Sequence, residues 1–177
     1  SAGIAPQAQP EPPKMAENFP YAMITLESVI DPPEDLSTLI KPSGTWLHLV
    51  RSGTKSSYCS LSDEQHNVLS LTRGDLPQKI FDATQWLDRH DDADNNDPVC
   101  VISIPALFIY ALGIVRERGP TAVVVSAPDE YKLLARDKGK KVEYTEIFLG
   151  ELLKRLRKNA SDSQFAKAAD NEQAVYG

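Results

Sequence analysis

Three hydroxyl side chains in the second half of the chain follow apolar runs: Ser103 in VISIPA, Ser126 in VVSAPD and Thr145 in VEYTEI. If each run is a buried parallel strand followed by a helix, the hydroxyls lie at helix N-termini along one sheet edge. Free backbone N–H groups and the helix dipole favour an anion there. With Asp129 and Glu130, these hydroxyls are the candidates for a ligand-binding site or an active site.

The same residues also fit a structural role as helix caps. Residues 126–129 read S-x-x-D, so the Ser126 hydroxyl can accept from a backbone N–H while Asp129 reaches back to the helix start. A catalytic carboxylate would also need a partner base, a metal or a nucleophile, and this segment contains none of them. We therefore favour capping as the interpretation of the segment.

Motifs for nucleotides and metals are missing or incomplete in the sequence. The chain contains neither GxGxxG nor GxxxxGK[ST], and its histidines (His48, His66 and His90) form no HExxH pair. Residues 92–103 begin with the spacing of a calcium loop, but Asp97 stands in place of its glycine and Ser103 in place of its final glutamate. We expect no cofactor and no metal, and we interpret the segment at 88–98 as a solvated acidic loop.

The remaining candidates for catalysis are one histidine and two cysteines. His48 alternates with Trp46 and Val50 along an expected strand, which favours a hydrogen-bonded sheet residue over a general base. Cys59 and Cys100 lie in strand-like runs without CxxC spacing, so we predict buried free thiols, with a single bridge as the alternative. Neither thiol lies at a strand-to-helix elbow, and a cysteine hydrolase is not expected.

Both ends of the chain are poor in large apolar residues. We expect a disordered Pro/Ala/Gln-rich tail at residues 1–19, one α/β domain at 20–158, and a mostly disordered tail at 159–177. The first fourteen residues fit a processed end, a linker from a longer protein or a cloning remnant. No run of 18 or more apolar residues occurs, so no membrane span is predicted.

The first half of the chain favours antiparallel strands. GTWLHLV and SSYCSL flank RSGTK, whose glycine permits a tight turn, so we predict a hairpin of strands at 46–50 and 57–61. NVLSLT can extend this hairpin as a third strand. YAMITLESVI fits either a strand or a helix, and PEDLSTLI fits one or two helical turns.

The second half favours helices between buried strands. Residues 75–90 carry Asp75 and Gln78 at capping-box spacing and apolar side chains at helical spacing, which predicts an amphipathic helix. Further strands are expected at 100–104, 122–126 and 141–145, alternating with helices at 105–119, 128–138 and 146–158. The predicted fold is a single-domain α/β protein whose mixed sheet has an N-terminal antiparallel hairpin and a C-terminal run of parallel βα units.

Basic residues gather toward the end of the expected domain, although the net charge of the chain is −6. The predicted helix at 146–158 places Phe148, Leu149, Leu152, Leu153 and Leu156 on one buried stripe. The surrounding cations are a candidate docking surface for an acidic partner: Lys138, Lys140, Lys141, Lys154, Arg155, Arg157 and Lys158. The alternative is a solvated face that offsets the helix dipole. Few aromatic residues accompany these cations, so nucleic-acid binding is not expected.

The sequence leaves two functions open. We favour a small α/β protein-interaction or regulatory module without catalytic activity, because catalytic and cofactor motifs are missing while the tails and the basic region suit contacts with another protein. The alternative is an enzyme or a small-ligand-binding protein that uses the hydroxyls and carboxylates at the carboxyl edge of the parallel strands. We expect a soluble protein and leave its compartment open, with the cytoplasm slightly favoured.

Overall fold

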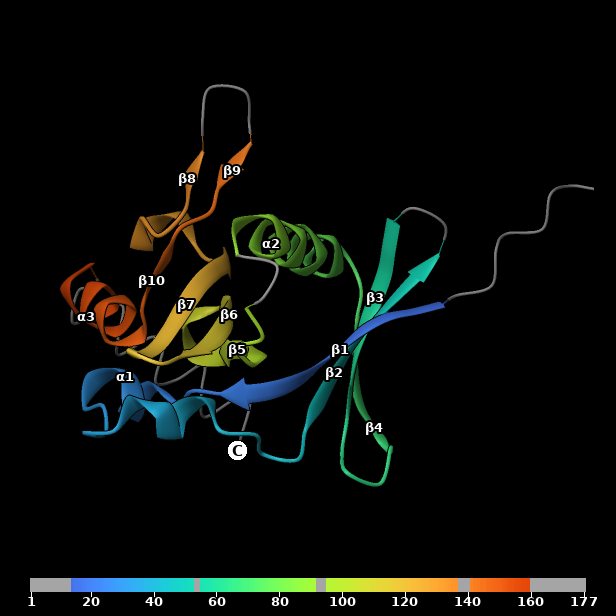
Figure 1. Cartoon of the computed structure of the whole chain (residues 1–177), viewed down its shortest axis with the longest axis horizontal. Coiled ribbons are helices and arrows are strands. Elements are labelled where there is room, and N and C mark those ends of the chain that lie inside the picture. The colour runs from blue at the N-terminus through green and yellow to red at the C-terminus, as the bar shows by residue number, and fades with distance from the viewer. Residues whose placement is uncertain (1–13, 53–54, 92–94, 137–140, 160–177) are drawn as a thin grey trace, which may run out of the picture.

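The computed structural model of the chain describes residues 14–52, 55–91, 95–136 and 141–159. Its centre is one mixed sheet of eight strands in the order β10-β7-β6-β5-β1-β2-β3-β4, and a separate ribbon, β8-β9, projects beside α2 (Figure 1). The strands are β1 (Lys14–Met23), β2 (Trp46–Ser52), β3 (Lys55–Ser62), β4 (Val68–Thr72), β5 (Val99–Ile104), β6 (Ile109–Arg116), β7 (Gly119–Ser126), β8 (Ala135–Arg136), β9 (Val142–Glu143) and β10 (Glu146–Phe148). The helices are α1 (Leu26–Ile30), α2 (Leu76–His90) and α3 (Leu149–Asn159), with short 3-10 turns η1 (Leu36–Ile40), η2 (Pro105–Leu107) and η3 (Asp129–Tyr131).

The predicted N-terminal hairpin is confirmed. β2 and β3 pair antiparallel, and β4 extends them as the third strand. The ambiguous run YAMITLESVI divides into two elements: β1 ends at Met23, and α1 begins after Thr25, whose hydroxyl accepts from the Ser28 backbone N–H. β1 starts at Lys14, so part of the segment expected to be a tail belongs to the sheet, whereas residues 1–13 and 160–177 lie outside the described residues.

The predicted run of parallel βα units is wrong. β5, β6 and β7 form an antiparallel meander, and the segment predicted as a helix at 105–119 is a 3-10 turn followed by β6. The segment is apolar on all sides because β6 is buried on both faces of the sheet, a pattern that short helices and strands share. Among the described strands, the one parallel pair is β1 with β5, through residues 21–23 and 101–103.

Gly113 in the middle of β6 shows why this segment is a strand. An added Cβ there would lie 2.7 Å from Ile102 Cδ1 and 2.8 Å from Cys100 Sγ, both on the neighbouring strand β5. Glycine and the β-branched Ile109, Ile114 and Val115 also disfavour a helix interior. Close strand packing therefore decides the conformation of this segment.

The elements after β7 also differ from the prediction. The expected helix at 128–138 is replaced in the described residues by η3 and β8, and the expected strand at 141–145 contains only the short β9. The last helix begins at Leu149, because Glu146–Phe148 forms β10 against β7. Phe148 is 54% exposed, so it is not part of the buried stripe, whereas the four leucines predicted for that stripe are fully buried.

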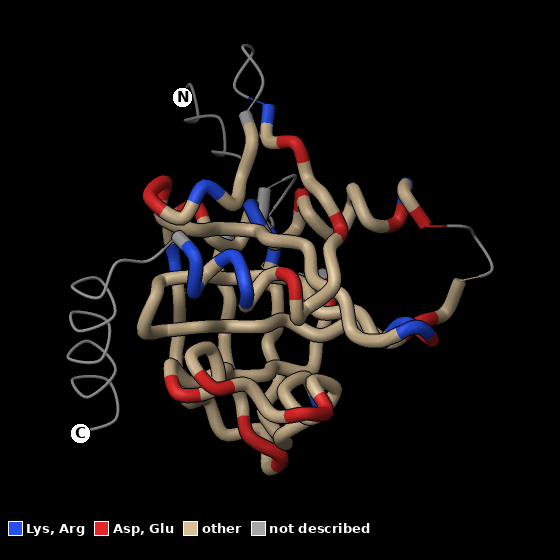
Figure 2. Tube along the Cα trace, turned by 90° about the vertical axis from the view of Figure 1, so that its left-hand side faces the viewer, with Lys and Arg blue, Asp and Glu red and all other residues tan. Residues whose placement is uncertain are grey.

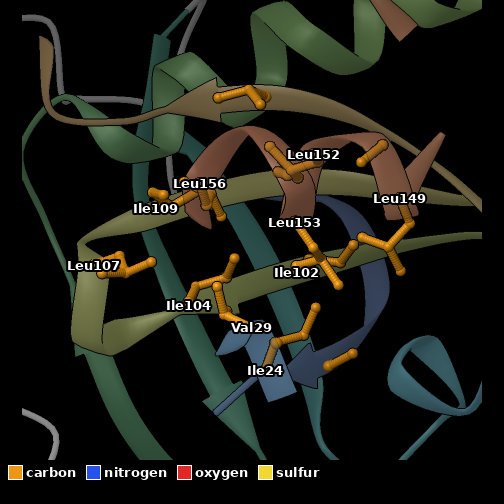
Figure 3. Close-up of a cluster of buried hydrophobic side chains, with 14 of the residues drawn as sticks. Ile24, Val29, Ile102, Ile104, Leu107, Ile109, Leu149, Leu152, Leu153 and Leu156 are labelled. Carbon is orange, nitrogen blue, oxygen red and sulfur yellow. The ribbon is translucent and has the colours of Figure 1, made fainter. Parts of the chain in front are cut away.

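One face of the sheet is covered by α1, α3 and the 3-10 turns. α3 inserts its leucines against the strands β5 and β6, and α1 and the segment after β1 close the cluster from the other side (Figure 3). Arg157 Nη1 donates to the Val29 carbonyl at 2.8 Å and so ties α3 to α1. Figure 3 labels ten of the buried side chains in this cluster: Ile24, Val29, Ile102, Ile104, Leu107, Ile109, Leu149, Leu152, Leu153 and Leu156.

The other face is covered by α2, whose predicted position at residues 75–90 is confirmed. Ile80, Ala83, Thr84 and Leu87 are buried at helical spacing against side chains from β1, β2, β6 and β7. The two faces thus hold two apolar clusters that share the same strands. Within the described residues, no helix is long and apolar enough to cross a membrane.

Candidate functional site

A hollow lies between α2 and the segment that contains β9. We call it the aromatic groove; it is open to solvent and has a volume of about 870 Å³. Residues from one side of α2 form one wall, and the chain leading from the β8-β9 ribbon to β10 forms the other. The lining residues are Asp82, Gln85, Trp86, Arg89, Lys141, Val142, Glu143, Tyr144 and Thr145.

Three aromatic rings form a row along this groove, and two of them, those of Trp86 and Tyr144, line it. The rings of Trp86 and His90 stack with their centroids 4.5 Å apart and their planes inclined by 12°. On the other side Trp86 contacts Tyr144 at 5.8 Å with a tilt of 45°. Trp86 and Tyr144 are partly buried at the margin of the apolar cluster below α2, so each ring has a packed part and an accessible part. Such half-packed rings offer rigid apolar contact area to a ligand.

Charged groups of both signs surround the aromatic row. Asp82 and Arg89 lie on α2, two turns apart, and Glu143 and Lys141 lie on the opposite wall. Gln78 Nε2 donates to Asp82 Oδ1 at 2.7 Å and thus fixes the position of that carboxylate. Burial, together with the Asp82 charge, raises the pKa of Tyr144, so its phenol is protonated and able to donate at neutral pH. The groove therefore supplies stacking surfaces, hydrogen-bond donors and charges.

The chain just after the groove wall is held by an arginine that binds three carboxylates. Arg116, at the end of β6, contacts Glu146 of β10, Asp91 at the C-cap of α2 and Asp97 in the loop before β5. The Arg116 side chain is only 15% exposed, and those of Glu146 and Asp91 are 17% and 20% exposed. We call this cluster the Arg116 hub. It joins the C-terminal end of α2 to β10, which directly follows the opposite wall of the groove.

The hub contains one positive side chain and three negative ones, and the hydrogen bonds between them shift the pKa values of Arg116 and Glu146. Hydrogen bonds from Arg116 hold the pKa of Glu146 below its ordinary value, with a smaller contribution from the Thr121 hydroxyl at 2.9 Å. In turn the carboxylates of Glu146 and Asp91 raise the pKa of Arg116. Charge-assisted bonds of this kind are about twice as strong as neutral ones. Arg116 was not among the residues singled out from the sequence.

The five residues predicted for a ligand site do not converge. Ser103 is fully buried in β5, and its Oγ has no hydrogen-bond partner among the described residues. Ser126 ends β7, and the exposed Asp129 and Glu130 belong to η3. Asp129 lines a separate hollow of about 270 Å³, whereas Thr145 lines the aromatic groove.

The predicted caps are also absent from the described structure. The turn after β7 begins at Pro128 without a side-chain cap, so the S-x-x-D pattern of Ser126 is not used as predicted. Asp75 caps nothing through its side chain either; it forms an ion pair with Lys79 at 3.1 Å. In both cases the backbone conformation differs from the one that the capping pattern assumes: η3 is a single 3-10 turn, and Asp75 is itself helical.

The predicted basic surface is present in part. Lys154, Arg155 and Lys158 are exposed on α3, where cations follow one another along the helix (Figure 2). Arg157 has a structural contact with α1, and Arg155 pairs with Glu151 at 3.2 Å. Lys141 lies in the aromatic groove, and Lys138 and Lys140 lie outside the described residues.

His48, Cys59 and Cys100 have the packing roles predicted for them. His48 connects three strands: its Nδ1 lies 2.7 Å from Asn18 Oδ1, and its Nε2 lies 2.6 Å from Ser62 Oγ. Burial lowers the pKa of His48, with a smaller effect from the charge of His66. Both cysteines are free and buried, and burial raises their pKa values to about 12 for Cys59 and about 11 for Cys100.

The aromatic groove was not predicted from the sequence, although one signal was present. Trp86 lies on α2 beside the buried stripe rather than within it, an unusual place for a large aromatic residue on an amphipathic helix. Its partner Tyr144 is 58 positions away along the chain, in a segment predicted to be a buried strand. The pair therefore depends on the tertiary arrangement.

Comparison with known proteins assigns no relative: no family model matches, and neither a curated protein nor a solved structure is significantly similar. Within the described part of the chain, no group of three or more His, Cys, Asp or Glu side chains is placed to hold a metal ion. The geometry of the groove and of the sheet is thus the basis for the proposals that follow.

Proposed function

We propose that the protein is a small interaction or regulatory module, without catalytic activity, that binds an extended segment of a partner protein in the aromatic groove. The observation that carries this proposal is the row of His90, Trp86 and Tyr144, of which Trp86 and Tyr144 line an open groove of about 870 Å³. Trp and Tyr dominate the binding energy of many protein interfaces because each buries a large rigid surface.

The charges favour a peptide over a wholly apolar ligand. Asp82 and Arg89 on one wall and Glu143 and Lys141 on the other can pair with charged side chains or with backbone groups of an extended chain. Apolar contacts at the centre with polar groups at the rim are typical of protein interfaces. The Arg116 hub ties the end of α2 to β10, which follows the opposite wall, and such preorganisation lowers the entropic cost of binding.

A ligand site at the edge of the strands has less support from the geometry. Its five candidate residues are divided among a buried strand position, an exposed turn and the groove itself. The exposed cations of α3, Lys154, Arg155 and Lys158, remain a proposed second contact surface for an acidic partner. That surface is separate from the residues that line the groove.

A peptide-display selection tests the groove. A library of random twelve-residue peptides is selected on the intact protein, and the affinities of the enriched peptides are measured by fluorescence polarisation for the wild type, Trp86→Ala and Trp46→Ala. Trp46 is the matched control because it is a 40% exposed tryptophan on β2, outside the groove. We expect Trp86→Ala to weaken binding by more than about tenfold, as truncation of an aromatic anchor does, and Trp46→Ala to leave it unchanged.

Thermal unfolding of both variants shows whether a loss of binding reflects a loss of the fold. Should no peptide be enriched, or should folded Trp86→Ala bind as the wild type does, the proposed role of the groove is wrong. Binding that depends on Trp46 instead would also contradict it, by placing the contact on the β2 surface.

A further inference from the structure

β4 is the last strand of the eight-stranded sheet, and within the described residues no strand pairs with its outer edge. Figure 1 shows the arm formed by β2, β3 and β4 extending beyond α2. The backbone N–H and C=O groups on such an edge form hydrogen bonds with another strand when one is supplied. Proteins commonly protect these edges with charges, prolines or a covering element.

The side chains of β4 lack that protection. Val68, Leu69 and Leu71 are exposed by 69%, 57% and 51%, and the strand itself contains neither a charge nor a proline. Its remaining residues, Ser70 and Thr72, are small and uncharged. An exposed apolar edge strand of this composition is suited to pairing with another strand.

We propose that β4 pairs with β4 of a second copy of this chain, in antiparallel orientation around a two-fold axis, so that the two sheets become one. This interface is separate from the aromatic groove and does not depend on the function proposed for the groove. The argument for a second copy, rather than a different protein, is the self-complementarity of the strand in its side chains and in its flanking charges.

The side chains match when Ser70 faces Ser70 of the second copy at the axis. Leu69 then lies opposite Leu71 of the other copy, and Leu71 opposite Leu69. In an antiparallel pair, opposite residues lie about 5 Å apart and their side chains share one face. Leu69 and Leu71 of each copy thereby meet those of the other copy across the two-fold axis, with Val68 opposite Thr72 at each end.

The flanking charges match in the same register. Arg73, just after β4, comes opposite Asn67 of the other copy, and Asn67 Nδ2 donates to the carboxylate of Asp63 at 3.0 Å. The exposed Glu64 lies in the same turn. Each end of the paired strands thus brings an arginine toward a carboxylate, twice by symmetry, which is the pattern of an isologous interface.

The pairing should be reversible and dependent on concentration. β4 has five residues, and its pairing with β3 has one irregularity: Leu61 pairs with Ser70 and Ser62 with Val68, so Leu69 is an extra residue in β4 that locally bends the edge. An interface of this length buries less area than the standard interfaces of stable complexes. We therefore expect a dimer that forms at high protein concentration and dissociates on dilution.

Sedimentation velocity over a range of protein concentrations tests the proposal directly. The wild type should shift from monomer to dimer as the concentration rises, and Leu71→Lys should reduce the association constant by more than about tenfold. Phe148→Lys is the matched control, because Phe148 is similarly exposed on β10 at the opposite end of the sheet. Circular dichroism of each variant checks that the fold survives.

A disulfide experiment tests the register. Ser70→Cys should form an intermolecular disulfide under mild oxidation, since facing residues across such a pair meet the geometric requirement for a bridge. Cys59 and Cys100 are buried and do not compete. The control Arg118→Cys, in the turn between β6 and β7, should form no intermolecular disulfide under the same oxidation.

Three outcomes would overturn the proposal. The first is a wild type that remains monomeric at millimolar concentration; the outer edge of β4 would then bind another protein or stay exposed to solvent. The second is a dimer that persists in folded Leu71→Lys, and the third is a Ser70→Cys variant that dimerises without forming the crosslink. The first two outcomes reject β4 pairing and the third rejects its proposed two-fold register at Ser70, whether or not the aromatic groove binds peptides.

Discussion

Arg116 shows how one side chain can connect the elements on both sides of a groove without lining it. Its guanidinium faces three carboxylates from three different segments, and their combined charge exceeds its own. The excess negative charge is tolerable because Asp97 is 35% exposed and all five N–H donors of an arginine can be directed at oxygen acceptors. The hub therefore ties β6, the end of α2 and β10 together, and Tyr144 and Thr145 directly precede Glu146 in the chain.

Glu146 makes the stability of this hub dependent on pH. Its folded-state pKa is lowered by Arg116 and Thr121, so the unfolded state binds the proton more readily than the folded state. The stabilisation is therefore present above the unfolded-state pKa of about 4.3 and is lost as the pH falls through the lower folded-state pKa. We expect Glu146→Gln to cost about 1–2 kcal/mol at pH 7 and to lose less stability than the wild type between about pH 5 and pH 3.

Urea unfolding at several pH values measures this difference. Glu143→Gln is the control, because it removes an exposed carboxylate three positions away that lies outside the hub. If the wild type and Glu146→Gln lose stability in parallel on acidification, Glu146 does not carry the acid sensitivity. The same result would weaken the case that the hub ties β10 to α2 and β6.

At the residue scale, hydrogen-bond partners were predicted less well than burial. The stripe of α3 leucines and the two free cysteines follow from composition and spacing, and the structure confirms them. Ser126 and Asp75 have capping patterns that the structure does not use. A cap requires a particular backbone conformation at the junction, and tertiary packing determines that conformation in both places.

At the scale of elements, the outcome depends on whether an apolar pattern is specific to one conformation. α2 has buried apolar residues on one face, and the two runs that pair as β2 and β3 lie on either side of the sequence RSGTK, so both were predicted correctly. β6 is apolar on all sides, a pattern that helices and strands share, and it was assigned wrongly. Strand β1 was divided between a tail and an ambiguous run because it contains few large apolar residues.

The close contact at Gly113 gives a test of the packing between β5 and β6. Gly113→Ala should destabilise the protein by about 1–3 kcal/mol, because the new methyl group overlaps Ile102 Cδ1 and Cys100 Sγ. Ile102→Val removes the nearer of these atoms. In the double variant the added cost of Gly113→Ala should therefore be smaller than in the wild-type background, as measured by chemical denaturation.

Equal costs of Gly113→Ala in the two backgrounds would show that contact with Ile102 Cδ1 is not the cause. The loss would then have to come from Cys100 or from the backbone, and Cys100→Ala distinguishes these two. The Cys100→Ala result thus identifies whether the Cys100 side chain or the backbone opposes a larger residue at position 113 of β6.

For the whole molecule, the topology depends on β1. This strand lies between β5 and β2 and so joins the C-terminal meander to the N-terminal hairpin in one sheet. The mixed sheet was predicted, but this arrangement was not, because the parallel pairing of residues 21–23 with 101–103 connects segments far apart in sequence. Local periodicity contains no information about such pairings.

The two apolar clusters lie on opposite faces of the same strands, and this arrangement predicts cooperative unfolding. Leu153 belongs to the cluster under α3, whereas Trp86 belongs to the margin of the cluster under α2. Because β5, β6 and β7 contribute side chains to both clusters, the loss of either cluster should destabilise the shared strands. The single domain predicted from the sequence would then unfold in one transition.

Leu153→Ala tests this cooperativity across the sheet. Removing a fully buried leucine should cost about 3–5 kcal/mol. Tryptophan fluorescence, which reports on Trp46 and Trp86 away from the mutation, should shift to lower denaturant concentration together with far-UV circular dichroism. Ile80→Ala, in the cluster under α2, is the reciprocal variant and should shift both signals in the same way. A fluorescence transition that stays in place while circular dichroism shifts in Leu153→Ala would show that the two faces unfold independently, and the prediction of one cooperative domain would be wrong.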